Sequence, residues 1–213
     1  MRDALDAAGI RDAAVCGVSY GGLVAAAFAA RFPERTSSLL LVSAVPAGWR
    51  PNARINFYLR APRLLTPVFM VASLRMYREI AAANEGVGSG VSAACRHGLR
   101  ALTHMFSPSR MARRVRLLER TDIRRQLAHL PAASGQLPTL IVTGEPALDN
   151  VVPVAATHEY LRIWPQASLA TLAHTGHLGL ITRPAAFANI VVPFAERAAM
   201  SSKNDSRPHY KIG

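Results

Sequence analysis

Four short apolar segments stand out along the chain, each about as long as a buried strand. They are bounded by glycine, proline or polar residues, and their apolar positions have no helical spacing. In chain order they are 13–18, 37–44, 138–144 and 168–172. Because continuous apolar runs are typical of strands covered on both faces, the pattern predicts a mostly parallel sheet flanked by helices.

The segments between these strands predict helices. The expected helices outside the middle of the chain are 2–9, 21–31, 154–163 and 184–199. The segment 21–31 is small and apolar almost throughout, which suits a helix packed tightly on a sheet. A loop is expected at 173–182, and the polar residues 200–213 are expected to form a disordered tail.

The pattern changes in the middle of the chain, where apolar residues recur at helical spacing and arginines fill the polar positions. Helices are expected at 55–65, 67–83, 91–105 and 109–128, with the flexible sequence NEGVGSG between the second and third. The chain therefore divides into residues 1–50 and 131–199, two parts of one core, and residues 51–130, an inserted helical lid.

Composition agrees with a single folded domain. The chain has 213 residues, of which 50% are hydrophobic and 18% charged, so a largely disordered protein is excluded. The two cysteines, Cys16 and Cys95, have neither disulfide-framework nor metal-ligand spacing. No apolar stretch reaches the length of a membrane span, and no apolar leader follows Met1. These features predict a cytoplasmic protein.

The net charge of +12 is concentrated in the helical middle of the chain. Between residues 51 and 130, 14 arginines against four acidic residues account for +10. A basic surface suits anionic substrates, a membrane face or nucleic acid. The arginines are spread out, however, and no nucleic-acid or phosphate-loop motif accompanies them. We interpret them as solvated helix faces and expect no nucleic-acid partner.

The sequence GVSYG, residues 17–21, lies where the first strand gives way to the small-residue helix. A serine hydroxyl is a nucleophile only when a base takes its proton and hydrogen-bond donors meet the oxyanion that forms. A sharp strand-to-helix turn projects Ser19 at the edge of the sheet and aims the first helical N–H groups at a reacting carbonyl. Residues two before and two after the serine must then be small, which explains Gly17 and Gly21.

Acidic and histidine residues follow in later loops at the same edge of the sheet. Asp149 comes after the strand 138–144, where its carboxylate can orient an imidazole, and Glu145 in the same loop is a lesser candidate. The loop after the last strand holds His174 and His177. A histidine there can accept the serine proton while a carboxylate holds its other ring nitrogen. The order serine, acid, histidine is more specific than the serine motif alone.

These three segments resemble the α/β-hydrolase fold family in its serine-nucleophile branch. The matching sequences are VCGVSYGGLVAAAFAARFPER, LPTLIVTGEPALDNVVP and HTGHLGLITRP. The resemblance implies that Ser19 is the nucleophile, Asp149 the acid and His177 the base, and that Tyr20 gives its backbone N–H to the oxyanion hole. It also implies that no metal or organic cofactor takes part.

The beginning of the chain departs from the family. Members usually start with several strands and a helix before the serine turn, whereas here only a short helix precedes the strand 13–18. We therefore expect an N-terminally truncated α/β-hydrolase fold, in which 13–18 forms an open edge and the loop carrying the second oxyanion donor is missing. Loss of one donor can lower turnover by about 10²–10³-fold.

The resulting functional prediction is a hydrolase that cleaves an ester-like carbonyl in a small apolar molecule. A carboxylic ester, a lactone, a thioester or a C–C bond would use the same groups. The alternative is a non-catalytic, hydrolase-like ligand-binding protein or an inactive fragment. The oligomeric state does not follow from the sequence.

Overall fold

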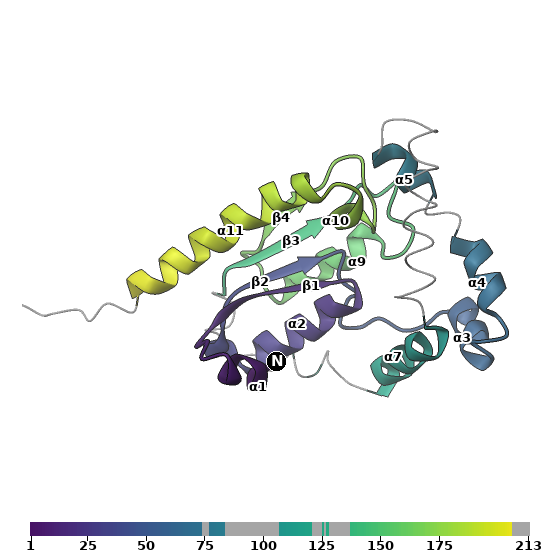
Figure 1. The fold of residues 1–213 in the computed structure, drawn as a ribbon, viewed down its shortest axis with the longest axis horizontal. Helices are drawn as coiled ribbons and strands as arrows, with labels where there is room; N and C mark the ends of the chain where they lie inside the picture. Colours follow the sequence, from purple (N-terminus) through teal and green to yellow (C-terminus); the bar gives the residue numbers. More distant parts are fainter. Residues whose placement is uncertain (74–76, 84–106, 121–124, 126, 128–136, 206–213) are drawn as a thin grey trace, which may run out of the picture.

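The chain folds around a four-stranded parallel sheet. A computed structural model describes residues 1–73, 77–83, 107–120, 125, 127 and 137–205. The strands are β1 (Ala13–Val18), β2 (Thr36–Val42), β3 (Thr139–Thr143) and β4 (Ser168–Thr171), side by side in chain order. Each neighbouring pair is parallel, so all four carboxyl ends meet at one edge (Figure 1). The predicted α/β class is confirmed.

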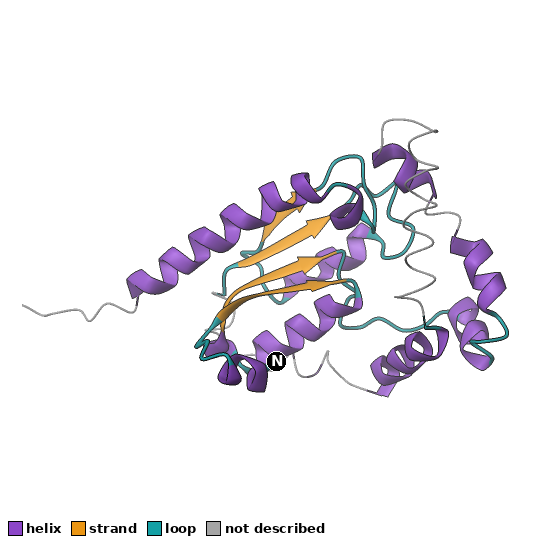
Figure 2. Ribbon diagram, in the orientation of Figure 1, coloured by secondary structure: helices purple, strands orange, loops and turns teal. Residues whose placement is uncertain are grey.

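Helices cover both faces of the sheet (Figure 2). α2 (Tyr20–Arg31) packs on one face and α11 (Pro184–Asp205) on the other. Side chains of a strand alternate between the two faces. In β2, Leu39 and Leu41 therefore join the core around α2, whereas Leu40 packs with the apolar residues of α11. This double burial explains why the strand segments are continuously apolar.

The remaining helices connect the strands or lie beyond their carboxyl ends. They are α1 (Arg2–Ala7), η1 (Pro33–Arg35), α3 (Ala53–Arg60), α4 (Thr66–Ser73), α5 (Tyr77–Ala83), α7 (Pro108–Arg120), α9 (Val154–His158), η5 (Glu159–Arg162) and α10 (Gly179–Thr182). Figure 1 shows α3, α4, α5 and α7 beyond the carboxyl ends of the strands. We call the described part of residues 51–130 the helical block.

Several helices differ in extent from the predictions. The expected helix 67–83 is described as α4 and α5, and the expected helix 91–105 lies outside the described residues. The loop expected at 173–182 contains the short helix α10. The prediction of a disordered tail at residues 200–213 is wrong up to Asp205, because α11 continues to that residue. No glycine or proline interrupts the chain between Ala199 and Asp205.

Strand β1 lies at an edge of the sheet and is only half covered. Val15 is buried, whereas Cys16 is exposed, although the continuous apolar run predicts a strand covered on both faces. Alternation explains the difference, since Val15 faces the core around α2 and Cys16 points to the opposite face. Among the described residues, no helix is both long and apolar enough to cross a membrane.

Candidate active site

The turn between β1 and α2 presents Ser19 at the carboxyl edge of the sheet. Ser19 has φ 53° and ψ −121°. Holding a non-glycine residue in this sparsely populated backbone conformation costs roughly 1–3 kcal/mol. Its N–H donates to the carbonyl of Val42 (2.9 Å), and its own carbonyl accepts from the N–H groups of Gly22 (3.0 Å) and Val45 (3.1 Å). The neighbouring strand and the helix thus hold the strained turn.

Close packing explains two of the three glycines around Ser19. A Cβ atom on Gly17 would overlap the carbonyl of Gly21, and one on Gly22 would overlap the Cβ of Ala44. A Cβ on Gly21 would have no described atom within 4 Å outside its own helical turn. The second crowded position is therefore Gly22, one residue after the Gly21 expected from the sequence. The crowding falls on Gly22 because this residue packs against the segment that follows β2.

The two adjacent glycines should respond oppositely to alanine. We expect Gly22→Ala to lower the free energy of unfolding by about 1–3 kcal/mol, since the overlap with Ala44 forces α2 or the facing segment to move. Gly21→Ala should raise it by about 0.5–1 kcal/mol, because alanine favours the helix and the position is open. Urea denaturation followed by circular dichroism measures both. Equal losses in the two variants would contradict the packing described.

Asp149 is held in the loop after β3 by backbone hydrogen bonds. Its Oδ1 atom accepts from the N–H of Val151 (3.0 Å) and from that of Val152 (2.9 Å), and its side chain is only 1% exposed. These bonds fix the carboxylate in a local turn. The acid predicted from the sequence therefore occupies a defined, buried position.

His177 lies beside this carboxylate. Its Nδ1 atom is 3.5 Å from Oδ1 of Asp149, and its side chain is 11% exposed. Within the described residues, neither Nδ1 of His177 nor Oδ2 of Asp149 has a hydrogen-bond partner. The separation exceeds the usual hydrogen-bond range of about 2.7–3.2 Å.

The electrostatics of this pair favour an ionised Asp149. Burial by itself would raise the pKa of Asp149, but the nearby His177 imidazole and the N–H groups of Val151 and Val152 outweigh it. The pKa of this carboxyl therefore lies below its ordinary value. A charged carboxylate next to Nδ1 favours the neutral imidazole tautomer that carries its proton on that nitrogen.

Glu145, the other acidic residue of this loop, has a different position. Its Oε1 atom accepts a hydrogen bond from the backbone N–H of His174 (2.7 Å), and its N–H donates to the carbonyl of Thr175 (2.7 Å). His174 has a positive φ of 60° and is exposed. Glu145 thus ties the acid loop to the histidine loop, while Asp149 is the acid next to His177.

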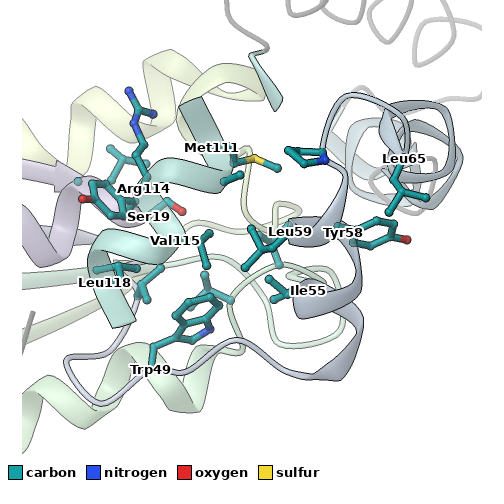
Figure 3. A pocket seen from close by; sticks show the side chains of 18 of the residues that line it. Ser19, Trp49, Ile55, Tyr58, Leu59, Leu65, Met111, Arg114, Val115 and Leu118 are labelled. Atoms are coloured by element: carbon teal, nitrogen blue, oxygen red, sulfur yellow. The ribbon is translucent and has the colours of Figure 1, made fainter. Parts of the chain in front are cut away.

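Ser19 opens onto a cavity of about 680 Å³ between the sheet edge and the helical block. Tyr20, Val45 and Trp49 line it on the core side, and Val151 and Val152 extend the wall to the loop of Asp149. The opposite wall consists of residues of α3, of α7 and of the segment after α3 (Figure 3). Most of these residues are apolar, and among the described ones Arg114 carries the charge.

Two buried hydroxyl groups support the core side of the cavity. Thr157 of α9 donates to the carbonyl of Ala44 (3.1 Å), and Tyr160 of η5 donates to that of Val45 (2.8 Å). Both residues are at most 1% exposed. The segment after β2 is therefore anchored from the second half of the chain.

Tyr20 occupies the first position of α2, directly after Ser19. The first N–H groups of a helix have no partner within it, so the N–H of Tyr20 is suited to receive a developing negative charge. The Arg114 guanidinium lies 6.0 Å from the centre of the Tyr20 ring. Among the described residues, no group of three or more His, Cys, Asp or Glu side chains could hold a metal ion.

The structure also places Glu79 of α5 at the site, which the sequence argument missed. This side chain is 1% exposed and accepts a hydrogen bond from the backbone N–H of Leu178, next to His177. In the sequence, Glu79 is one charge in an arginine-rich helical segment, 99 residues from its partner. The local signal is the short apolar run 80–83, which follows Glu79 directly and ends α5.

The fold just described is that of the α/β hydrolases. The sequence profile of the alpha/beta hydrolase family matches residues 1–190. The chain therefore belongs to this family, and the resemblance noted in the sequence is confirmed. No curated protein matches the chain at a significant level.

Solved structures show the same architecture. A hydrolase from Pseudomonas aeruginosa PA01 is 23% identical over 91% of this chain and 68% of its own, with a TM-score of 0.65. The meta-cleavage product hydrolase of Pseudomonas fluorescens IP01 is 21% identical over 92% and 68%, with a TM-score of 0.54. The 2-hydroxy-6-oxo-6-phenylhexa-2,4-dienoate hydrolase of Rhodococcus sp. strain RHA1 is 21% identical over 89% and 66%, with a TM-score of 0.53. These likenesses show the fold alone, and the chain spans about two thirds of each structure's length.

Proposed function

We propose that this protein is a serine hydrolase that cleaves an ester-like carbonyl in a small apolar molecule through an acyl-enzyme. The observation that carries the proposal is the strained Ser19 at the mouth of an apolar cavity, whose wall continues into the loop that pairs Asp149 with His177. Strain at a residue that opens onto a cavity is a recognised mark of functional sites. The predicted Ser19, Asp149 and His177 act together as a catalytic triad.

In the first half of the reaction, the Ser19 oxygen bonds to the carbonyl carbon as its proton passes to Nε2 of His177. The carbonyl oxygen becomes an oxyanion that the N–H of Tyr20 stabilises, and Asp149 balances the charge on the imidazolium. The bond from the carbon to the leaving group then breaks, and the leaving group takes the proton from His177. The acyl group remains on Ser19.

In the second half, a water molecule replaces the leaving group. Its oxygen bonds to the acyl carbon while His177 takes one of its protons, and that proton returns to Ser19 as the carboxylic acid departs. Side chains, backbone and water supply every group, so the proposal includes no cofactor. It retains the cytoplasmic location predicted from the sequence.

The cavity favours a substrate whose acyl or alcohol portion is apolar. Ile55, Leu59 and Val115 face it from the helical block, so transfer of a hydrocarbon group from water into this space is favourable. Met111 also lines the cavity, whereas Phe57 is 49% exposed and does not. A carboxylic ester, a lactone, a thioester and a cleavable C–C bond all fit the proposed chemistry.

The long separation between Asp149 and His177 favours one alternative function. At 3.5 Å, Asp149 and His177 do not form the hydrogen bond that catalysis needs. A hydrolase-like protein that binds apolar ligands in the same cavity without cleaving them would tolerate this gap.

A fluorophosphonate probe separates the two functions. We expect the wild-type chain to form a covalent adduct on the peptide that contains Ser19, and Ser19→Ala to form none, because the probe bonds only to an activated serine. Quenching of Trp49 fluorescence by an apolar ester reports cavity binding in both proteins, with Trp49→Phe as the control. Quenching without labelling of the wild type would support the ligand-binding alternative and reject the hydrolase.

A further inference from the structure

Glu79 is a buried carboxyl group with no role in the reaction as proposed. It belongs to α5, which packs against α10 immediately after the histidine loop. Figure 1 shows these two helices next to each other, although they are far apart in the sequence. A glutamate that is 1% exposed is expensive to bury unless its oxygen atoms are hydrogen-bonded. Its partners therefore indicate what it stabilises.

The hydrogen-bond partner of Glu79 belongs to the backbone directly after His177. Oε1 of Glu79 accepts a hydrogen bond from the N–H of Leu178. Burial raises the pKa of Glu79, while the backbone N–H groups of Leu178 and Gly176 act in the opposite direction. The carbonyl of Leu178 in turn accepts from the N–H groups of Ile181 (2.8 Å) and Thr182 (3.0 Å) in α10. Leu178 is thus held at both its N–H and its carbonyl.

The acid loop anchors the histidine loop from another side. Gly176 lies so close to the backbone of Leu148 and Asp149 that a Cβ atom would not fit, which fixes the loop on its acid-loop side. Glu79 holds the opposite side, from the helical block. The backbone around His177 is therefore held by the acid loop and by α5.

We propose that Glu79 is a positioning residue, which fixes the backbone directly after His177 so that its imidazole stays beside Asp149 and within reach of Ser19. This role rests on the proposed hydrolase function. Displacement of a catalytic group by about 1 Å can lower a rate by about 10²-fold, so such an anchor has a large effect. Glu79 acts through His177 and touches no substrate.

The position of Glu79 also predicts which kinetic constant it affects. Among the described residues that line the cavity, none belongs to α5. A change at Glu79 should therefore lower kcat and leave KM nearly unchanged, because substrate binding does not use this helix.

Two substitutions isolate the hydrogen bond from the volume of the side chain. Glu79→Leu fills the same space without an acceptor, and Glu79→Gln keeps a carbonyl oxygen that can accept from Leu178. The exposed Arg78 of the same helix provides the control Arg78→Ala. We expect Glu79→Leu to slow fluorophosphonate labelling and kcat by about 10-fold or more, Glu79→Gln to restore most of the rate, and Arg78→Ala to match the wild type.

Hydrogen exchange measured by mass spectrometry tests the anchor without any catalysis. The peptide that contains residues 176–178 should exchange faster in Glu79→Leu than in the wild type, and Glu79→Gln should restore its protection. If the wild type is not labelled, the proposed function fails, and the exchange result still decides whether Glu79 holds the loop. Unchanged exchange in Glu79→Leu, or a labelled wild type that Glu79→Leu matches in rate, would overturn the inference.

Discussion

His177→Ala is expected to lower kcat for ester hydrolysis by about 10³–10⁶-fold with little change in KM. Without the imidazole, the proton of Ser19 loses its proposed acceptor, and the leaving group loses its proposed proton donor. Binding in the apolar cavity does not use this ring, because His177 is not among the residues that line it. Steady-state kinetics with a chromogenic short-chain ester measures both constants.

The neighbouring histidine supplies a matched control. His174 lies in the same loop, but its side chain is exposed, and its known contact is made by its backbone N–H. His174→Asn keeps a residue that tolerates the positive φ of 60° at this position. Its kcat should stay close to that of the wild type. A comparable loss in both variants would mean that the loop, rather than the His177 imidazole, is what catalysis requires.

Asp149→Asn is expected to lower kcat by about 10⁴-fold. An amide in place of the carboxylate can present its N–H₂ group to Nδ1 of His177 and so favour the wrong tautomer. Glu145→Gln is the matched comparison, since glutamine keeps an oxygen that can accept from the N–H of His174. A larger loss in Glu145→Gln than in Asp149→Asn would reassign the acid.

Asp149→Asn should also change how the free energy of unfolding depends on pH. Because the pKa of Asp149 is lower in the folded protein than its unfolded value of about 3.9, its carboxylate stabilises the fold above that pH. This stabilisation is lost as the pH falls through the folded pKa. The free energy of unfolding of the wild type should therefore fall more steeply in acid than that of Asp149→Asn. Parallel curves would show that Asp149 is not the ionised partner of His177.

The sheet could be predicted from the sequence because its signals are local. The continuous apolar runs of β2 and β3 follow directly from burial on both faces, and the small residues of α2 from close packing on the sheet. The site followed from the same logic, since parallel strands bring their following loops to one edge. The structure places Asp149 beside His177 and Ser19 in a strained turn, while their catalytic roles remain predictions.

What could not be predicted depends on contacts between distant segments. The crowding at Gly22 depends on Ala44, and the burial of Glu79 depends on Leu178. The end of α11 at Asp205 differs from the prediction for another reason, because polar composition alone does not distinguish an exposed helix end from a disordered tail.

The hydrogen bonds from Thr157 and Tyr160 fix the backbone of Ala44 and Val45, so the core side of the cavity is rigid. Changes in the shape of the cavity are therefore left to the helical block. Hydroxyl-to-carbonyl bonds are directional, and both are buried where water cannot replace them. A ligand of unusual shape must therefore be accommodated by side chains of α3 and α7. Attempts to retarget the protein to new compounds should vary those two helices and leave α9 and η5 untouched.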